Sequence, residues 1–94
     1  MSEDSSPGIR IRADVRIQRV GREAILHDPV TRQAHVINAA AAQVWDLCDG
    51  RDLDALATSF GAPYGRTGDE VKGDVERVVD GFRRLGLLDP DAAA

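Results

Sequence analysis

Cysteines and long hydrophobic runs are scarce in this chain of 94 residues, and each shortage excludes a class of protein. The single cysteine, Cys48, excludes a disulfide framework within one chain and any metal site built from several cysteines. No uncharged run of roughly eighteen apolar residues occurs, which excludes a membrane-spanning helix. Because no apolar segment follows the N-terminal methionine, we expect no secretory signal and a cytoplasmic location.

The composition and length favour one small, soluble domain. Hydrophobic residues make up 43% and charged residues 30% of the chain, which is typical of a globular protein. The polar segment at residues 1–8 has almost nothing apolar to bury, and residues 90–94 form a short end segment. We therefore expect disordered tails at 1–8 and 90–94 around a folded unit at residues 9–89. The net charge of −4 argues against general nucleic-acid binding, which depends on a basic surface.

The charge is unevenly distributed along the sequence. Arginines outnumber acidic residues between Ile9 and Gln33, whereas acidic residues dominate from Asp46 onward. One interpretation is that both parts simply carry solvated faces. The other is a partly basic sheet beside acidic helices, an arrangement that is able to orient a charged peptide.

Three segments have the pattern of β-strands. Apolar and polar residues alternate strictly over residues 9–18, which predicts a half-buried strand. A short apolar run at Ala24–His27 predicts a second strand, and a run rich in β-branched residues at Ala34–Ile37 predicts a third. Because Asp28-Pro29 favours a turn, we expect the second and third strands to pair as a hairpin.

Three helices follow, each preceded by a residue that can cap its first turn. Asn38 precedes an alanine-rich helix to about Cys48, Asp52 precedes a helix to Phe60, and Asp69 precedes the longest helix, before Gly86. The longest helix has one apolar stripe, which comprises Val71, Val75, Val78, Val79, Phe82 and Leu85. Strands followed by helices predict an α+β fold in the order βββααα, with helices on one face of a three-stranded antiparallel sheet.

No constellation of side chains in the sequence is typical of a catalytic or metal site. His27 and His35 lie on neighbouring predicted strands without cysteines or carboxylates clustered around them. Cys48 is a lone cysteine on an apolar helix face, where it is expected to act as a small buried hydrophobe. The glycine-rich loop at residues 61–68 lacks both the spacing and the lysine of a phosphate-binding loop. We therefore expect a protein that is not an enzyme and needs no metal or cofactor.

The sequence resembles the PqqD family of small leader-peptide-binding domains, also called RiPP recognition elements, which act on ribosomally made and later modified peptides. Three stretches carry the resemblance, namely AILHDPVTRQAHVINAAAAQVWDLCDG, LATSFGAPY and VKGDVERVVDGFRRLGLLD. Within them, the family pattern is matched by Leu26 to Asp28, Ile37-Asn38, Val44-Trp45, Asp49-Gly50, Asp74-Val75 and residues 85–88. The hairpin turn departs from the pattern, because Thr31 is followed by Arg32 where the family commonly has glycine.

The resemblance implies a winged-helix-like domain that binds the leader of a precursor peptide as an added strand, between the third strand and the third helix. It also implies a non-catalytic role, in which the leader is presented to a modifying enzyme such as a radical SAM protein, a leader peptidase or a cyclase. An exposed sheet edge can accept such a strand. The expected peptide-binding residues are Gln33, Ala34, His35, Val36, Ile37, Asp74, Arg77, Val78, Gly81, Phe82 and Leu85.

The alternative hypothesis is a DNA-binding regulator, since winged-helix architectures also bind nucleic acid. A recognition helix for DNA should present clustered basic side chains to a groove. The predicted third helix instead mixes Arg77, Arg83 and Arg84 with five acidic residues, which would repel phosphates. The sequence therefore favours a peptide as the partner, with neither nucleic acid nor membrane.

Overall fold

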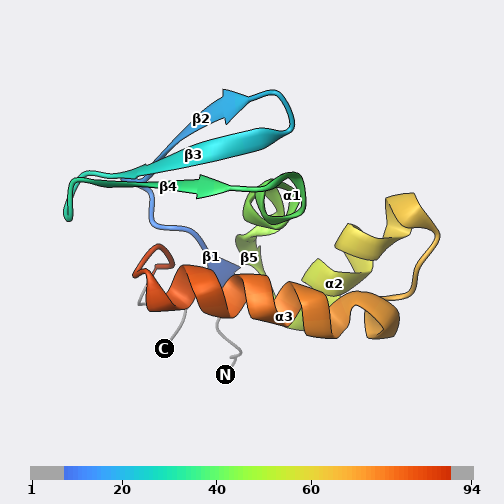
Figure 1. The fold of residues 1–94 in the computed structure, drawn as a ribbon. Helices are drawn as coiled ribbons and strands as arrows, with labels where there is room; N and C mark the ends of the chain where they lie inside the picture. The colour runs from blue at the N-terminus through green and yellow to red at the C-terminus, as the bar shows by residue number, and fades with distance from the viewer. Residues whose placement is uncertain (1–7, 90–94) are drawn as a thin grey trace, which may run out of the picture.

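A three-stranded antiparallel sheet lies across one side of the molecule and a long C-terminal helix across the other, in a computed structural model that describes residues 8–89 (Figure 1). The elements in chain order are β1 (Ile9–Arg10), β2 (Arg16–Val20), β3 (Glu23–Asp28), β4 (Gln33–Ile37), α1 (Ala39–Leu47), β5 (Asp49–Arg51), α2 (Leu53–Gly61), the 3₁₀ turn η1 (Ala62–Tyr64) and α3 (Gly68–Arg84). The α+β, winged-helix-like class expected from the sequence is confirmed, with two additional short strands, β1 and β5.

The sheet has the strand order β2-β3-β4, so β4 lies at one edge. Leu26 of β3 pairs with Ile17 of β2 on one side and with His35 of β4 on the other. Because cross-strand partners share a face of the sheet, these residues form an inner row, which is the face that packs on the core. The neighbouring row, with Ile25 opposite Val36, belongs to the outer face.

The single strand predicted over residues 9–18 is wrong in its extent. The chain forms β1, turns at residues 13–14 and then begins β2 at Arg16. β1 pairs with β5, and Ile11 forms an isolated bridge with Leu88. The side chain of Arg12 turns to Asp28 and to the carbonyl of Gly86, so the polar member of the alternation is bound within the fold. Tertiary hydrogen bonds therefore override the local period of two.

Two of the three predicted caps are confirmed, and the third is two residues out of place. The side chains of Asn38 and Asp52 accept hydrogen bonds from backbone amides in the first turns of α1 and α2. The cap of α3 is Thr67, not Asp69, because Thr67 and Glu70 form a reciprocal capping box. The sequence TGDE, at residues 67–70, carries this signature. Asp69 lies inside the first turn, where its negative charge interacts favourably with the helix dipole.

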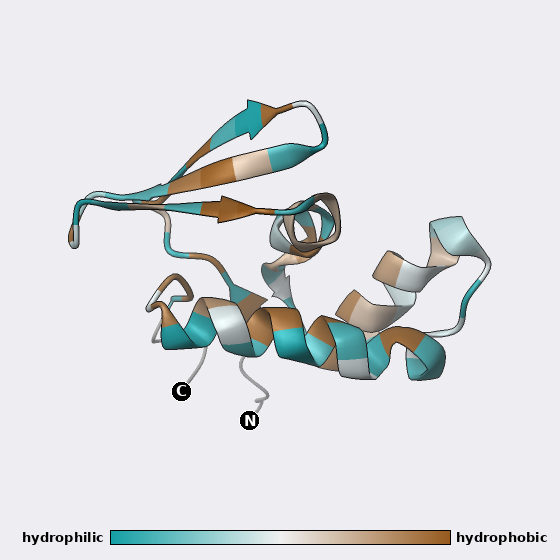
Figure 2. Cartoon of the chain, in the orientation of Figure 1, coloured by the Kyte–Doolittle hydropathy of each residue, from teal (hydrophilic) through white to brown (hydrophobic). Residues whose placement is uncertain are grey.

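The core joins the inner face of the sheet to the apolar stripe of α3. Leu26, Leu56 and Leu87 are fully buried, and Trp45 packs edge-to-face against Phe82 with ring centroids 5.2 Å apart. Figure 2 shows how apolar and polar residues alternate along α3, so that one helix carries a core face and a solvated face. α3 thus packs against α2 and α1, and its buried residues share one core cluster with those of the sheet.

Most of the two predicted tails lies outside the described residues, which begin at Gly8 and end at Asp89. Gly8 itself is half-buried. Among the helices between residues 8 and 89, none is long and apolar enough to cross a membrane.

Candidate functional site

The outer edge of β4 offers backbone groups without a strand partner in the part of the chain that the structure describes. β4 pairs only with β3 there, and the sheet ends at β4. The β4 side chains on the outer face are open to solvent, since Ala34 is exposed and Val36 is 74% exposed. Such an edge is a template for an additional strand.

Along the inner face of β4, the burial of the side chains increases from Gln33 to Ile37. Gln33 is exposed, His35 is half-buried opposite Leu26, and Ile37 is buried opposite Ala24. A strand added beside β4 would therefore meet a polar side chain at one end and an apolar one at the other. His35 is at the middle of this gradient, between the exposed Gln33 and the buried Ile37.

One flank of α3 carries the predicted helical part of the site. Asp74, Val78, Gly81 and Leu85 recur at helical spacing, which places them on one face. Val78 and Gly81 are half-buried, whereas Leu85 is 45% exposed at the end of the helix. A Cβ added at Gly81 would have no heavy atom within 4 Å, apart from the helix's own backbone. The flank therefore has open space beside the backbone of Gly81.

Other members of the predicted site are placed differently. Phe82 is only 3% exposed and packs on Trp45, and Ile37 is 9% exposed, so both belong to the core that lies behind the surface. Asp74 and Arg77 are exposed and form an ion pair with each other one turn apart on α3. Ile37 of β4 and Phe82 of α3 thus belong to one core cluster, against which Val78 packs, whereas Asp74 and Arg77 lie further toward the helix N-terminus.

The exposed face of α3 does not resemble a DNA-recognition surface. Asp80 pairs with Arg83 in the same way as Asp74 pairs with Arg77, and both pairs neutralise arginines that a phosphate would need. Acidic side chains also fill its first turn. This arrangement does not favour the DNA-binding alternative.

Arg12 is a structural residue of the site that sequence reasoning missed. Its guanidinium donates to both carboxylate oxygens of Asp28, at 3.1 and 3.2 Å, and to the carbonyl oxygen of Gly86 at 2.9 Å. Asp28 starts the β3–β4 turn and Gly86 follows α3, so one side chain joins the two elements that flank the site. No local pattern indicates this contact, because Arg12 and Gly86 are far apart in sequence.

The carboxylate of Asp28 is buried and held in its ionised form. It accepts the hydrogen bonds from Arg12 and a further one from the backbone amide of Val30 at 2.9 Å. These bonds, that of Arg12 foremost, lower the pKa of Asp28 below its ordinary value, although burial acts in the opposite direction. The hydrogen bonds of Arg12 to Asp14 and, next, to Asp28 raise the pKa of Arg12, so the whole group stays charged.

The β3–β4 turn has an unusual residue where the sequence departs from the family pattern. Arg32 has a φ of 61°, in the left-handed region that glycine adopts without steric cost. Its amide donates to the carbonyl of Asp28 at 2.8 Å and closes the turn. The turn therefore forms with the geometry that glycine would favour, but with an arginine side chain in place.

Cys48 is not arranged as a nucleophile. It is 2% exposed, and its thiol donates to the carbonyl of Val44. Burial raises its pKa to about 12, so the reactive thiolate is scarce at neutral pH. Across residues 8–89, no group of three or more histidine, cysteine or acidic side chains is placed to hold a metal ion.

Comparison with known proteins gives one family and one related fold. The family described as "Coenzyme PQQ synthesis protein D (PqqD)" matches residues 23–88. The solved structure "TbiB1 in Complex with the TbiA(beta) Leader Peptide" superposes with a TM-score of 0.74 at 18% sequence identity, covering 86% of this chain and 95% of that one. At this identity, the likeness establishes a shared fold. No curated protein gives a significant sequence match.

Proposed function

This chain belongs to the PqqD family, and we propose that it is a non-catalytic module that binds the leader of a ribosomally made precursor peptide by strand addition. The single observation that carries the proposal is the outer edge of β4, which has no strand partner among residues 8–89. Backbone pairing would supply affinity, and the side chains on β4 and α3 would supply specificity. The fold shared with TbiB1, a protein whose structure was solved in complex with a leader peptide, supports the same function.

The peptide-binding surface in this proposal combines β4 and one flank of α3. On β4 it comprises the backbone of Gln33, Ala34, His35, Val36 and Ile37, with His35 providing the central side chain. On α3 it comprises Val78, Gly81 and Leu85, supported from behind by Phe82, with Asp74 and Arg77 at its far end. The open space beside Gly81 supports a close approach of the peptide at that point.

The proposed second partner is the enzyme that modifies the precursor, such as a radical SAM protein, a leader peptidase or a cyclase. Holding the leader raises the effective concentration of the remaining peptide at that enzyme without contacts to the reacting atoms. The buried and protonated thiol of Cys48 supports a non-catalytic role. A cytoplasmic location fits a partner that ribosomes synthesise.

Fluorescence anisotropy with a labelled leader, taken from a short precursor encoded beside this gene, tests the proposal. We expect saturable binding with a Kd on the order of micromolar or tighter, roughly −8 kcal/mol. A scrambled leader of the same composition is the control. Amide hydrogen exchange then locates the peptide, since β4 amides directed outward should gain protection on binding. Absence of saturable binding to every precursor encoded nearby would contradict the proposal.

A further inference from the structure

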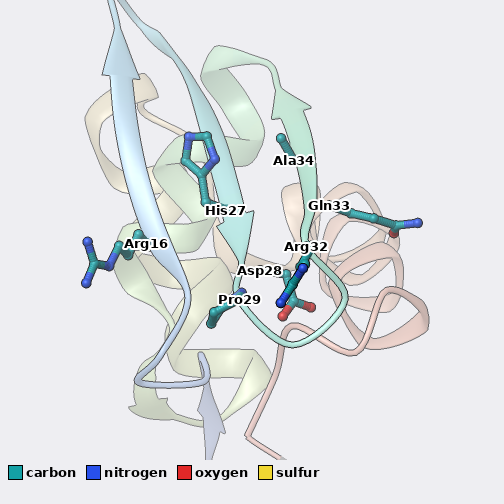
Figure 3. A pocket seen from close by; sticks show the side chains of 7 residues that line it. All are labelled: Arg16, His27, Asp28, Pro29, Arg32, Gln33 and Ala34. Atoms are coloured by element: carbon teal, nitrogen blue, oxygen red, sulfur yellow. The ribbon is translucent and has the colours of Figure 1, made fainter.

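A small pocket lies on the outer face of the sheet, at the turn end of the β3–β4 hairpin (Figure 3). We call it the hairpin pocket; it has a volume of about 190 Å³ and is lined by Arg16, His27, Asp28, Pro29, Arg32, Gln33 and Ala34. Arg16, His27 and Ala34 form one row across the three strands, because they are successive partners in the ladder. This volume suits a single side chain, since cofactor sites are usually roughly 300 Å³ or larger.

The hairpin pocket has an excess of positive charge. Neither Arg16 nor Arg32 forms an ion pair within residues 8–89. The acidic group in the lining, Asp28, accepts hydrogen bonds from the amide of Val30 and from Arg12, which it shares with Asp14. By contrast, Arg19 on the same strand as Arg16 is paired with Asp46. The lining therefore has two arginines and one carboxylate, and this excess of positive charge favours an anionic occupant.

The backbone of Arg32 gives a second, independent indication. A left-handed φ of 61° is unfavourable for residues other than glycine, asparagine and aspartate. The arginine therefore occupies this position at a conformational cost that glycine would avoid. Backbone outliers of this kind cluster at active sites and ligand-binding sites.

We propose that the hairpin pocket receives an aspartate or glutamate side chain of the docked peptide, from the residue that pairs beside Ala34. This inference rests on the proposed function, since it needs a peptide strand next to β4. Cross-strand neighbours share a face, so that peptide side chain would lie on the outer face in the row of Ala34 and His27. Strands are about 4.8 Å apart, so His27 lies about 10 Å from the docked strand, across the small side chain of Ala34.

The occupant is therefore a carboxylate carried by the peptide itself. The pocket begins at Gln33 and Ala34, which also belong to the free edge of β4, so the two surfaces are continuous. A carboxylate reaching over Ala34 would approach Arg32 at the turn, and its charge would complement the unpaired arginines. The core-facing side of β4 would contact apolar side chains of the peptide, whereas the outer face would bind one acidic side chain.

Selection from a random displayed peptide library on the immobilised protein tests the inference without knowledge of the natural leader. Binding peptides that protect β4 amides from hydrogen exchange are retained. We expect them to share an aspartate or glutamate at one fixed position. Replacement of that residue by its amide should weaken binding to the wild type by roughly tenfold, as expected for loss of a charge-assisted contact.

The same peptide pair is then measured on Arg32→Gly and on Arg22→Gly, which remove the same charge inside and outside the hairpin pocket. Arg32→Gly suits the left-handed turn, so we expect an intact fold and a melting temperature at or above that of the wild type. On this variant, the acidic peptide and its amide should bind within about twofold of each other. On Arg22→Gly, the roughly tenfold difference should persist.

Three outcomes count against the inference. Retained peptides without a shared acidic position, or an equal loss for the amide peptide on Arg32→Gly and the wild type, would overturn it and leave the proposed function standing. The first of these is also the result expected if the hairpin pocket instead contacts an acidic surface of a partner enzyme. Failure to obtain any peptide that protects β4 would contradict the proposed function and the inference together.

Discussion

Arg12 joins Asp28 to the end of α3 by donating hydrogen bonds to the Asp28 carboxylate and to the carbonyl oxygen of Gly86. Asp28 is 2% exposed, and the side chain of Arg12 is 18% exposed. The contact fixes the turn end of the β3–β4 hairpin relative to α3. Because the proposed peptide site combines β4 with a flank of α3, we expect Arg12 and Asp28 to position that site as well as to stabilise the fold.

Asp28→Asn should lower the melting temperature by several degrees at neutral pH, since Arg12 would lose a buried charged partner. The pKa of Asp28 is lowered in the folded protein, so its ionised form is the one that stabilises the fold. This contribution is fully present above the unfolded pKa, near 4, and is lost as the pH falls through the lower folded pKa. Thermal unfolding over a pH series should therefore show a shallower acid decline for the variant.

Asp46→Asn is the matched control for that experiment. Asp46 also forms an ion pair with an arginine, Arg19, but both side chains are about half exposed. Exposed pairs contribute little to stability, so the melting temperature should barely change. An equal change in melting temperature for the two variants would show that burial does not make the Asp28–Arg12 pair more stabilising than an exposed pair.

His35→Ala should weaken leader binding while the fold stays intact. His35 is half-buried at the middle of the inner face of β4, where a docked strand would contact it. Anisotropy titration measures the affinity, and circular dichroism checks the fold. Val20→Ala, at the opposite edge strand of the same sheet, is the control and should bind as the wild type does. Unchanged affinity for His35→Ala would remove this histidine from the site.

Gly81→Ala should stabilise the free protein by about 1 kcal/mol and weaken peptide binding. Glycine inside a helix is less favourable than alanine, and the added methyl group would meet open space in the free protein. Urea unfolding measures the first effect and peptide titration the second. Gly73→Ala, on an exposed part of the same helix with equally open space, should give the stabilisation alone. Unaltered binding by the Gly81 variant would place the peptide elsewhere.

Phe82 and Leu85, three residues apart on α3, should separate stability from binding. Phe82→Ala removes the aromatic partner of Trp45 from the core and should cost about 3–5 kcal/mol in the free energy of unfolding. Leu85→Ala changes a 45% exposed side chain, so stability should stay within about 0.5 kcal/mol while peptide affinity falls. The two measurements are urea unfolding and anisotropy; a large stability loss for Leu85→Ala would assign that residue to the core.

Local signals predicted the helices and the hairpin well. The caps at Asn38 and Asp52 need only their own first turn, and the end of α3 at Gly86, with a φ of 73°, needs only a glycine. The cap of α3 was misplaced because Asp69 is also a good capping residue by type. The reciprocal contact of Thr67 with Glu70, which is also local, decides the true position.

Long-range contacts explain what the sequence did not predict. β5 exists because β1 pairs with it, and neither strand has a periodic pattern long enough to be recognised alone. The link from Arg12 to Gly86 spans most of the chain. For the candidate site, the β4 edge and the α3 flank followed from alternation, helical spacing and family resemblance. The core positions of Ile37 and Phe82 required knowledge of how the layers pack.

The bridge between Ile11 and Leu88 ties the beginning of the domain to its end. Backbone bonds from Arg12 to Leu87 and from Asp89 to Arg10 reinforce that closure. Residues 10–12 can therefore form these native contacts only when residues 87–89 are present to pair with them. Shortening the chain before Leu87 should therefore release its first strand as well as its last turn.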